Sequence, residues 1–203
     1  MGKEQRMFGD YIVRAEIQIG KYEIVICESD KVPAEERYMC AYVESNDIFA
    51  QCTECMVSES YADIVTLYGE RITQKAKEMQ QIIEKEGKIT GDDSEIVAEQ
   101  CIPITEKDNL ENKVMVIRGD VLRPEYRRAT HQIMLCTGGS GAMPMARGKT
   151  CFCKSLFDSH DTRFYRQDVL GVLDENRMPE WVKSKLQKME QQPEIKKSED
   201  KCR

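Results

Sequence analysis

Between Tyr11 and Val57, four runs of residues alternate between hydrophobic and polar positions with the two-residue period of β-strands. Two such runs, within residues 11–27, flank Gly20-Lys21, which predicts a β-hairpin. Two more, Tyr38–Val43 and Ile48–Val57, are separated by the polar segment Glu44–Asp47, which has the composition and length of another hairpin turn. The pattern therefore predicts a four-stranded antiparallel meander.

From Tyr61 the period lengthens to about 3.6 residues, which predicts an amphipathic helix over Tyr61–Glu86. Ser58 or Ser60 is placed to cap its start and Gly87 to end it. We expect its apolar stripe to pack on the open face of the sheet; the alternative, a dimerising coiled coil, requires more heptads than the pattern supplies. The stripe consists of Tyr61, Val65, Tyr68, Ile72, Ala76, Met79 and Ile83.

Between Lys88 and Lys113 the chain is polar and acidic, which predicts a connector with a boundary near residue 95 or, alternatively, a solvated flank of one domain. A second unit follows. Pro179 in a first-turn position predicts a last helix that ends near Gln191. The strands predicted before it are Val114–Ile117, Gln132–Thr137, Thr150–Phe157, Arg163–Tyr165 and Val169–Leu173.

The chain is therefore expected to have an α+β fold, in which an N-terminal antiparallel β-meander packed on one long helix precedes a small, mostly-β unit with a C-terminal helix. The first unit would span residues 1–95. An arginine- and glycine-rich β unit would span residues 96–192. Residues 193–203 are expected to form a disordered tail.

Composition narrows the class of protein. The 203 residues are 40% hydrophobic, which is enough to build a core, and 33% charged. No apolar run approaches the roughly 18 residues of a transmembrane helix. The N-terminus carries charges where a signal peptide needs its apolar segment, so we expect a cytoplasmic protein without a membrane partner.

Charge is distributed unevenly along the chain. Residues 1–113 carry 13 Lys+Arg and 24 Asp+Glu, whereas residues 114–203 carry 17 and 12. The net charges are −11 and +5. This asymmetry indicates either two faces that dock on each other or a basic surface for an acidic partner, with the acidic half available to a basic one.

Nine scattered cysteines are expected to be reduced thiols, most of them buried. Cys52 and Cys55 have the spacing of a zinc knuckle or a redox pair. Residues three apart in a strand point to opposite faces, and Thr53-Glu54 offers no glycine for a tight turn. We therefore predict neither a metal site nor a cofactor.

The turn Thr137–Thr150 ends in Gly-Lys-Thr, as a phosphate-binding loop does. Met143 stands where such a loop needs glycine, and a strand follows in place of a helix, so nucleotide hydrolysis is not expected. The glycines instead permit positive φ, and their backbone N–H groups with Arg147 could bind an anion. The residues of this candidate anion-binding turn are Gly138, Gly139, Gly141 and Gly148.

Arginines and aromatic residues alternate in the second unit, a composition suited to phosphate contacts and base stacking. Some of these arginines could equally pair with Asp120, Glu125, Asp161 or Asp168. No catalytic residue is predicted, because His131 and Cys136 would lie on opposite faces of one strand. The candidate nucleic-acid- or partner-binding residues are Arg118, Arg123, Tyr126, Arg127, Arg128, Arg147, Lys149, Arg163 and Arg166.

The block from Leu122 to Cys153, followed by RFYRQDVLGV and MPEWVKSKL, resembles uncharacterised accessory proteins of clostridial conjugative elements. The block is also similar to a segment of the large polyvalent proteins of those elements. No activity is established for that family. The residues that carry the resemblance are Leu122, Arg123, Pro124, Glu125, Tyr126, Arg127, Gly138, Gly139, Gly141, Arg147, Gly148, Arg163 and Pro179–Trp181.

The resemblance implies an accessory role on a mobile genetic element. The leading hypothesis is a non-enzymatic counter-defence inhibitor, of anti-CRISPR or antirestriction type, that binds a host nuclease or nucleoprotein complex. The first alternative is a nucleic-acid-binding accessory factor of conjugation. The second is a small enzyme that holds a phosphate-bearing substrate at the glycine turn near His131.

Overall fold

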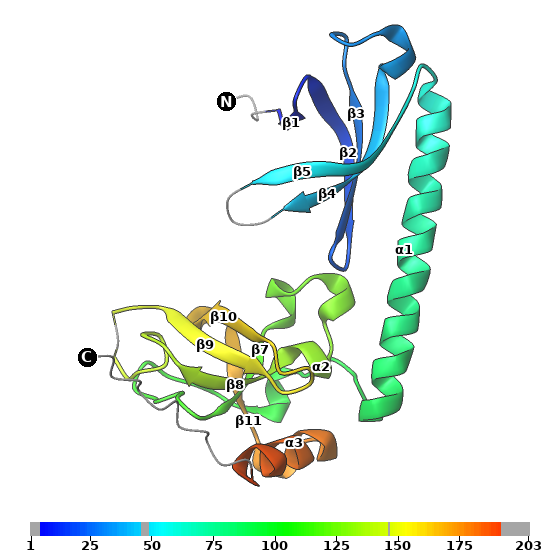
Figure 1. Ribbon diagram of the computed structural model, residues 1–203. Helices are drawn as coiled ribbons and strands as arrows, with labels where there is room; N and C mark the ends of the chain where they lie inside the picture. The colour runs from blue at the N-terminus through cyan, green and yellow to red at the C-terminus, as the bar shows by residue number, and fades with distance from the viewer. Residues whose placement is uncertain (1–4, 46–48, 146, 192–203) are drawn as a thin grey trace, which may run out of the picture. The chain divides into compact units, whose positions relative to one another are not determined.

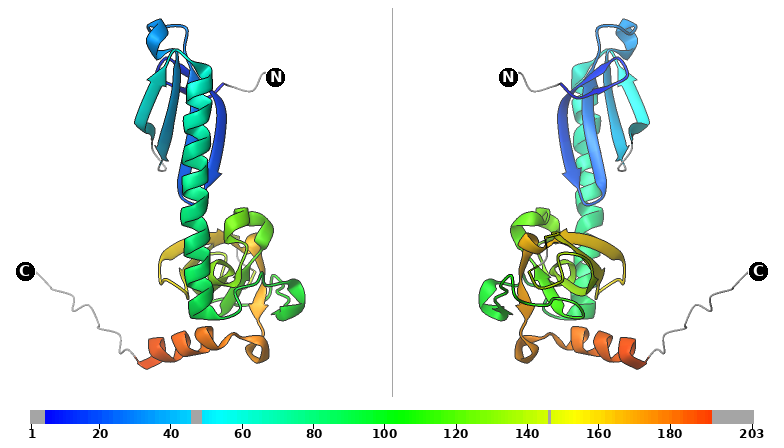
Figure 2. Two further views of the ribbon diagram at one scale, coloured as in Figure 1. Left: turned by 90° about the vertical axis from the view of Figure 1, so that its right-hand side faces the viewer. Right: turned by 90° about the vertical axis from the view of Figure 1, so that its left-hand side faces the viewer.

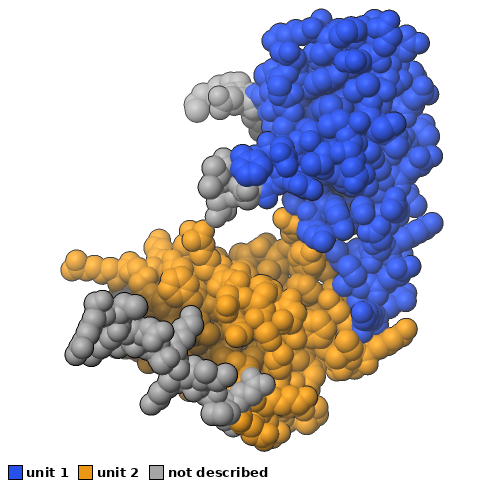
Figure 3. All heavy atoms as spheres, in the orientation of Figure 1, with its two compact units in different colours: residues 1–85 blue, residues 86–203 orange. Residues whose placement is uncertain are grey.

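The computed structural model describes residues 5–45, 49–145 and 147–191. The chain divides into two compact units, residues 1–85 and residues 86–203 (Figure 3). Two antiparallel sheets and three α-helices give an α+β fold, as predicted (Figure 1). The predicted disordered tail falls on residues 192–203, which lie outside the described part of the chain.

The first unit contains a five-stranded antiparallel sheet in the order β1-β2-β3-β4-β5. The prediction of four strands was wrong by one, because the short β1 pairs with the start of β2. The hairpin at Gly20-Lys21 is confirmed. The second predicted turn falls partly on residues 46–48, outside the described residues. The strands are β1 (Met7–Phe8), β2 (Tyr11–Ile19), β3 (Tyr22–Glu28), β4 (Tyr38–Ser45) and β5 (Ala50–Ser58).

Helix α1 (Tyr61–Thr90) lies across one face of this sheet (Figure 2). Ser60 caps it, since its Oγ accepts a hydrogen bond from the backbone N–H of Asp63 at 3.3 Å. The predicted stripe is confirmed at Tyr68 and Ile72, which pack against the core of the sheet. It is wrong at the start of the helix, where Ile64 is 2% exposed but Tyr61 and Val65 are 49% and 42% exposed. Ile64 packs with Ile24, Ile26 and Cys40 of the sheet.

The predicted end of α1 at Gly87 is also wrong. The helix continues to Thr90, and Gly91, with a φ of +79°, follows it. The N–H of Gly91 still donates to the carbonyl of Gly87 at 2.9 Å. Glycine costs a helix interior only about 1 kcal/mol, so Gly87 can be helical, while the left-handed residue beyond the last turn requires Gly91.

The second unit contains a six-stranded antiparallel sheet in the order β10-β9-β8-β7-β11-β6. The five predicted strands are present with small shifts at their ends, and the two-residue strand β6 was not predicted. The strands are β6 (Cys101–Ile102), β7 (Val114–Ile117), β8 (Ile133–Gly138), β9 (Thr150–Ser155), β10 (Asp161–Tyr165) and β11 (Val169–Leu173).

Gln132 was predicted to start β8 but instead ends a short helix, α2 (Ala129–Gln132). Its side chain is fully buried. The amide donates to the carbonyls of Ile96 and Ile117 and accepts a hydrogen bond from the N–H of Ile96. These three hydrogen bonds satisfy the buried amide of Gln132 in its place at the end of α2.

Helix α3 (Glu180–Gln191) confirms the predicted C-terminal helix and buries Val182. Val182 packs with Val116, Ile133 and Leu173 on one side of the second sheet. The other side encloses a separate core around Met115, with the cysteines of β8 and β9. Among the described residues, no helix combines the length and apolar character needed to cross a membrane.

Candidate nucleic-acid interface

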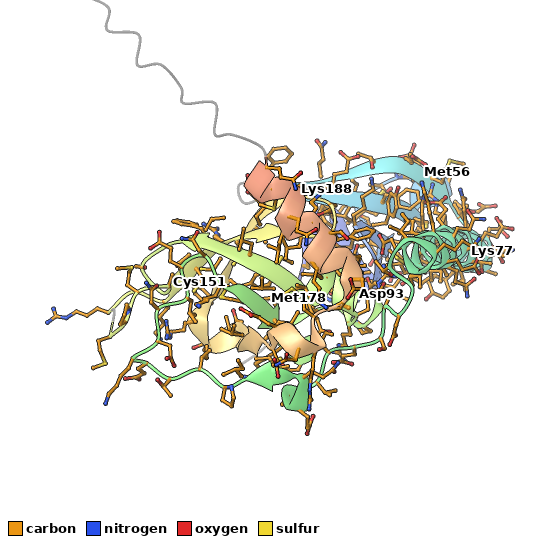
Figure 4. The ribbon with its side chains drawn as sticks, turned by 90° about the horizontal axis from the view of Figure 1, so that it is seen from below. Met56, Lys77, Asp93, Cys151, Met178 and Lys188 are labelled. Atoms are coloured by element: carbon orange, nitrogen blue, oxygen red, sulfur yellow. The ribbon has the colours of Figure 1, made fainter. Side chains whose placement is uncertain are left out.

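Arg128 is an internal residue of the second unit. It is 6% exposed, and its guanidinium lies 2.5 Å from Glu86 and 3.6 Å from Asp93. Asp93, in the segment after α1 (Figure 4), also accepts hydrogen bonds from the N–H and hydroxyl of Thr130. Burial raises the pKa of Glu86, and Arg128 opposes that shift. Arg128 therefore compensates buried carboxylates and does not form part of a contact surface, contrary to the expectation from its position in the arginine block.

Arg118, Arg127 and Tyr126, which lie close to Arg128 in the sequence, also have partners within the protein. Arg118 pairs with Asp120 at 2.5 Å, as the alternative interpretation of these arginines expected. The Nε of Arg127 donates to the carbonyl of Leu122 at 3.2 Å. Tyr126 is half-buried, and its ring stacks on His131 with 4.6 Å between centroids. These contacts fix the chain between β7 and α2.

His131 belongs to this internal cluster. Its Nδ1 lies 3.0 Å from the hydroxyl of Thr130, and burial lowers its pKa to about 4. Strand β8 separates His131 from the glycine turn, because the histidine precedes the strand and the turn follows it. The structure does not bring together the two parts of the hypothetical phosphate-substrate site.

The glycine turn is a closely packed connection between β8 and β9. A Cβ on Gly139 would lie 2.5 Å from the carbonyl of Thr150, and one on Gly141 would lie 2.3 Å from that of Lys149. The N–H of Gly141 donates to Thr150 at 2.7 Å. Gly139 also has a φ of +104°. These glycines are needed for close approach and for positive φ, and the N–H of Gly141 is already used within the protein.

Arg166 anchors this turn. Its guanidinium donates to the carbonyl of Gly141 at 2.7 Å and to those of Thr105 and Asp108 at 2.6 and 2.8 Å. One arginine thus joins the glycine turn to the loop before β7. Its donors are largely occupied, so we assign it to positioning the turn.

The outer face of β9 and β10, side by side in Figure 1, carries exposed aromatic and basic side chains. Phe152 and Tyr165 are each 54% exposed. Arg163 lies directly opposite Phe152 in the register and two residues before Tyr165 on the same strand. All three therefore project from one face, since side chains of a strand alternate and directly opposite residues share a side.

Arg147 and Lys149 lie at the end of the turn, immediately before β9. Both are exposed, and neither forms an ion pair with a described residue, which is also true of Arg163. Arg147 and Lys149 line a hollow of about 490 Å³ together with Met143 and Met145. We call Arg147, Lys149, Phe152, Arg163 and Tyr165 the basic-aromatic surface.

Phe152 was missed as a site residue by sequence reasoning, although a signal for it existed. In the run Cys151-Phe152-Cys153, the two cysteines are 0% and 1% exposed. Strand alternation then directs the phenylalanine outward. Phe164 of β10 is by the same alternation directed inward, and it packs against the core.

No group of three or more His, Cys, Asp or Glu side chains suited to a metal ion occurs in the described residues. Comparison with protein-family models, curated proteins and solved structures gives no match to this chain. The assignment of the site therefore rests on the geometry of the basic-aromatic surface.

Proposed function

We propose that this protein binds single-stranded nucleic acid through the basic-aromatic surface. The observation that supports the proposal is the position of Arg163 beside two exposed rings on β9 and β10, at one edge of the second sheet. A stacked base would remove the apolar faces of these two rings from water. A base stacks on a ring while the adjacent phosphate meets a cation, which is the usual basis of sequence-tolerant binding to single strands.

A single strand fits this surface better than a duplex does. Bases within a duplex are stacked on one another, so Phe152 and Tyr165 could contribute no stacking to a paired partner. Three cations that form no ion pair within the described part of the chain would supply phosphate contacts over a short stretch of strand: Arg147, Lys149 and Arg163. Binding would weaken as the salt concentration rises, since each contact releases counterions.

The experiment measures binding of fluorescently labelled single-stranded DNA and RNA, and of the matched duplexes, by fluorescence anisotropy. We expect Phe152→Ala and Tyr165→Ala each to weaken binding of the single strands by about 1–3 kcal/mol, the usual contribution of one stacked base. Tyr61→Ala is the matched control, because Tyr61 is 49% exposed but lies on α1. Unchanged affinity in both surface variants would contradict the proposal.

A second candidate is a counter-defence inhibitor that contacts a host nuclease complex of restriction or CRISPR type. The acidic first unit favours it, because residues 1–85 carry 10 Lys+Arg and 16 Asp+Glu. An acidic unit would complement the basic channel in which a nuclease complex holds its guide or target strand. The sequence resemblance to mobile-element proteins supports a role for either function in conjugation or in counter-defence.

Cleavage assays with purified restriction and RNA-guided nucleases test this second candidate. We expect the protein to inhibit cleavage and Glu35→Lys/Glu36→Lys to relieve the inhibition, since both carboxylates are exposed in the loop before β4. Phe152→Ala would leave inhibition unchanged if the acidic surface makes the contact. Uninhibited cleavage by every nuclease tested would contradict this candidate.

A further inference from the structure

Strand β5 carries the Cys52-Thr-Glu-Cys55 motif at a β-bulge. Tyr42 of β4 is opposite Thr53, but Cys40 is opposite Met56, so Glu54 and Cys55 together face Ala41. An extra residue of this kind shifts the alternation of side chains by one position. The sequence-based expectation that the two cysteines lie on opposite faces is therefore wrong.

The backbone at Glu54 makes the bulge possible. Its φ of +49° is in the left-handed region, which the sequence reasoning had reserved for glycine. Cys52 packs on the sheet face that contains Val25 and Ala41, and the bulge brings Cys55 to the same side. The two thiols thus become neighbours on one side of β5.

A buried arginine holds this bulge in place. Arg71 of α1 is 8% exposed and donates to the carbonyls of Glu54 at 2.7 Å and Cys40 at 3.2 Å. Its guanidinium also lies over the ring of Tyr42, 4.7 Å from the centroid. Both strands that flank the bulge are thereby tied to the helix, so the left-handed backbone at Glu54 is a built feature of the fold.

The two thiols interact directly. The pKa of Cys52 rises from 9.0 to about 11, mainly by burial and then by the neighbouring Cys55, whose side chain is hydrogen bonded to it. Cys55 is exposed, as is the residue that follows it, Met56 (Figure 4). One sulfur is therefore open to reagents while its neighbour lies partly beneath it.

We propose that Cys52 and Cys55 form a thiol-oxidation site that closes to an intrastrand disulfide at the bulge. The co-reactant is a low-molecular-weight disulfide such as oxidised glutathione. This site lies in the first unit and is independent of the proposed nucleic-acid binding.

The reaction balances as two thiol–disulfide exchanges. The thiolate of Cys55 attacks one sulfur of the small disulfide, which breaks its S–S bond and releases one small thiolate. The thiolate of Cys52 then attacks the sulfur of Cys55, forms the protein disulfide and releases the second small thiolate. The protein loses two electrons and two protons, and the small disulfide becomes two thiols.

The experiment incubates the full chain with a series of ratios of oxidised to reduced glutathione, then blocks remaining thiols with iodoacetamide for peptide mass spectrometry. We expect the peptide with both cysteines to lose two hydrogens and to escape alkylation. Cys52→Ser and Cys55→Ser abolish that species, and Cys52→Ser accumulates the mixed disulfide at Cys55. Cys101→Ser, a half-buried thiol of the second unit, is the matched control and leaves it unchanged.

Two substitutions at Glu54 test the role of the left-handed backbone while both cysteines are kept. Glu54→Gly keeps the left-handed backbone available, so the disulfide forms at least as readily as in the unaltered protein. Glu54→Val disfavours that backbone, and a penalty of about 1.4 kcal/mol corresponds to a tenfold smaller equilibrium constant for closure. Far-ultraviolet circular dichroism of both variants shows that the fold is kept.

Equal closure in Glu54→Gly and Glu54→Val would overturn the role of the bulge. Persistence of two alkylated thiols at every glutathione ratio, in a chain that remains folded, would overturn the site itself. Neither result would alter binding by the basic-aromatic surface, which lies in the other unit.

Discussion

Two groups of arginines in the second unit have opposite environments. Arg118, Arg127 and Arg128 lie between β7 and α2 and contact groups of the protein, namely carboxylates or a backbone carbonyl. Arg147 and Arg163, on the glycine turn and β10, are exposed and form no ion pair with described residues. The first group organises the fold, and the second is available to a ligand. Density of arginine along a sequence therefore does not locate a binding surface.

Arg128→Ala tests this comparison most severely. Removing the guanidinium leaves the carboxylates of Glu86 and Asp93 buried without a positive partner, so we expect a loss of about 3–5 kcal/mol in the free energy of unfolding. Urea denaturation measures it. The double variant Arg128→Met/Glu86→Gln should lose less than the sum of its single variants, and additive losses would contradict the pairing.

The second test is the pH dependence of the free energy of unfolding, because His131 lies close to the internal Arg128. The folded-state pKa of His131 is about 4, below its ordinary 6.5, because burial and the nearby Arg128 disfavour the imidazolium. Folding thus favours the neutral ring, and this contribution to stability is present above pH 6.5 and lost as the pH falls toward 4. Denaturation curves across that range, with His131→Phe as the control, measure it. An equal decline in His131→Phe would assign the loss to other groups.

For the exposed cations we expect a smaller effect, which is confined to nucleic-acid binding. Alanine at Arg147, Lys149 or Arg163 should each reduce the slope of log K against log salt by about 0.7, the value for one phosphate contact on a single strand. The melting temperature should stay the same. Anisotropy titrations at several salt concentrations measure the slope. A lower melting temperature in these variants would place their side chains in the fold.

The smallest effect is expected at Arg118. Its ion pair with Asp120 is exposed, at 46% and 63% of the two side chains, so Arg118→Ala should change neither the free energy of unfolding nor the affinity measurably. Parallel denaturation and anisotropy experiments check both quantities. A clear loss of affinity would extend the interface to this segment and remove the distinction between the two groups.

The uneven distribution of charge has a different interpretation when the chain is divided at the boundary between the two units. Divided at residue 113, the chain has an acidic front and a basic rear. Divided at the boundary between the units, residues 1–85 have a net charge of −6, whereas residues 86–203 carry 20 Lys+Arg and 20 Asp+Glu. The second unit therefore has no net charge, and the three cations of the basic-aromatic surface are offset by acidic residues elsewhere in the unit.

The sequence by itself determined the strands, the long helix and the order of the elements. Alternation located β2 and β11 closely, since a one-residue slip would turn their apolar side chains to the other face. Short apolar runs located β7 and the centre of β3, whose residues are buried on both faces. The same alternation predicts that the side chain of Phe152 points outward. Helical periodicity and Ser60 likewise marked the start of α1.

Tertiary structure alone decided which polar groups face one another. Arg128 meets Glu86 across about forty residues of chain, and Arg71 meets Glu54 from a different element. The arginine then holds a left-handed backbone at a glutamate, which reverses the side on which Cys55 lies. Local patterns report the preference of each residue for its neighbours in sequence, whereas buried charges and bulges depend on partners that only folding brings together.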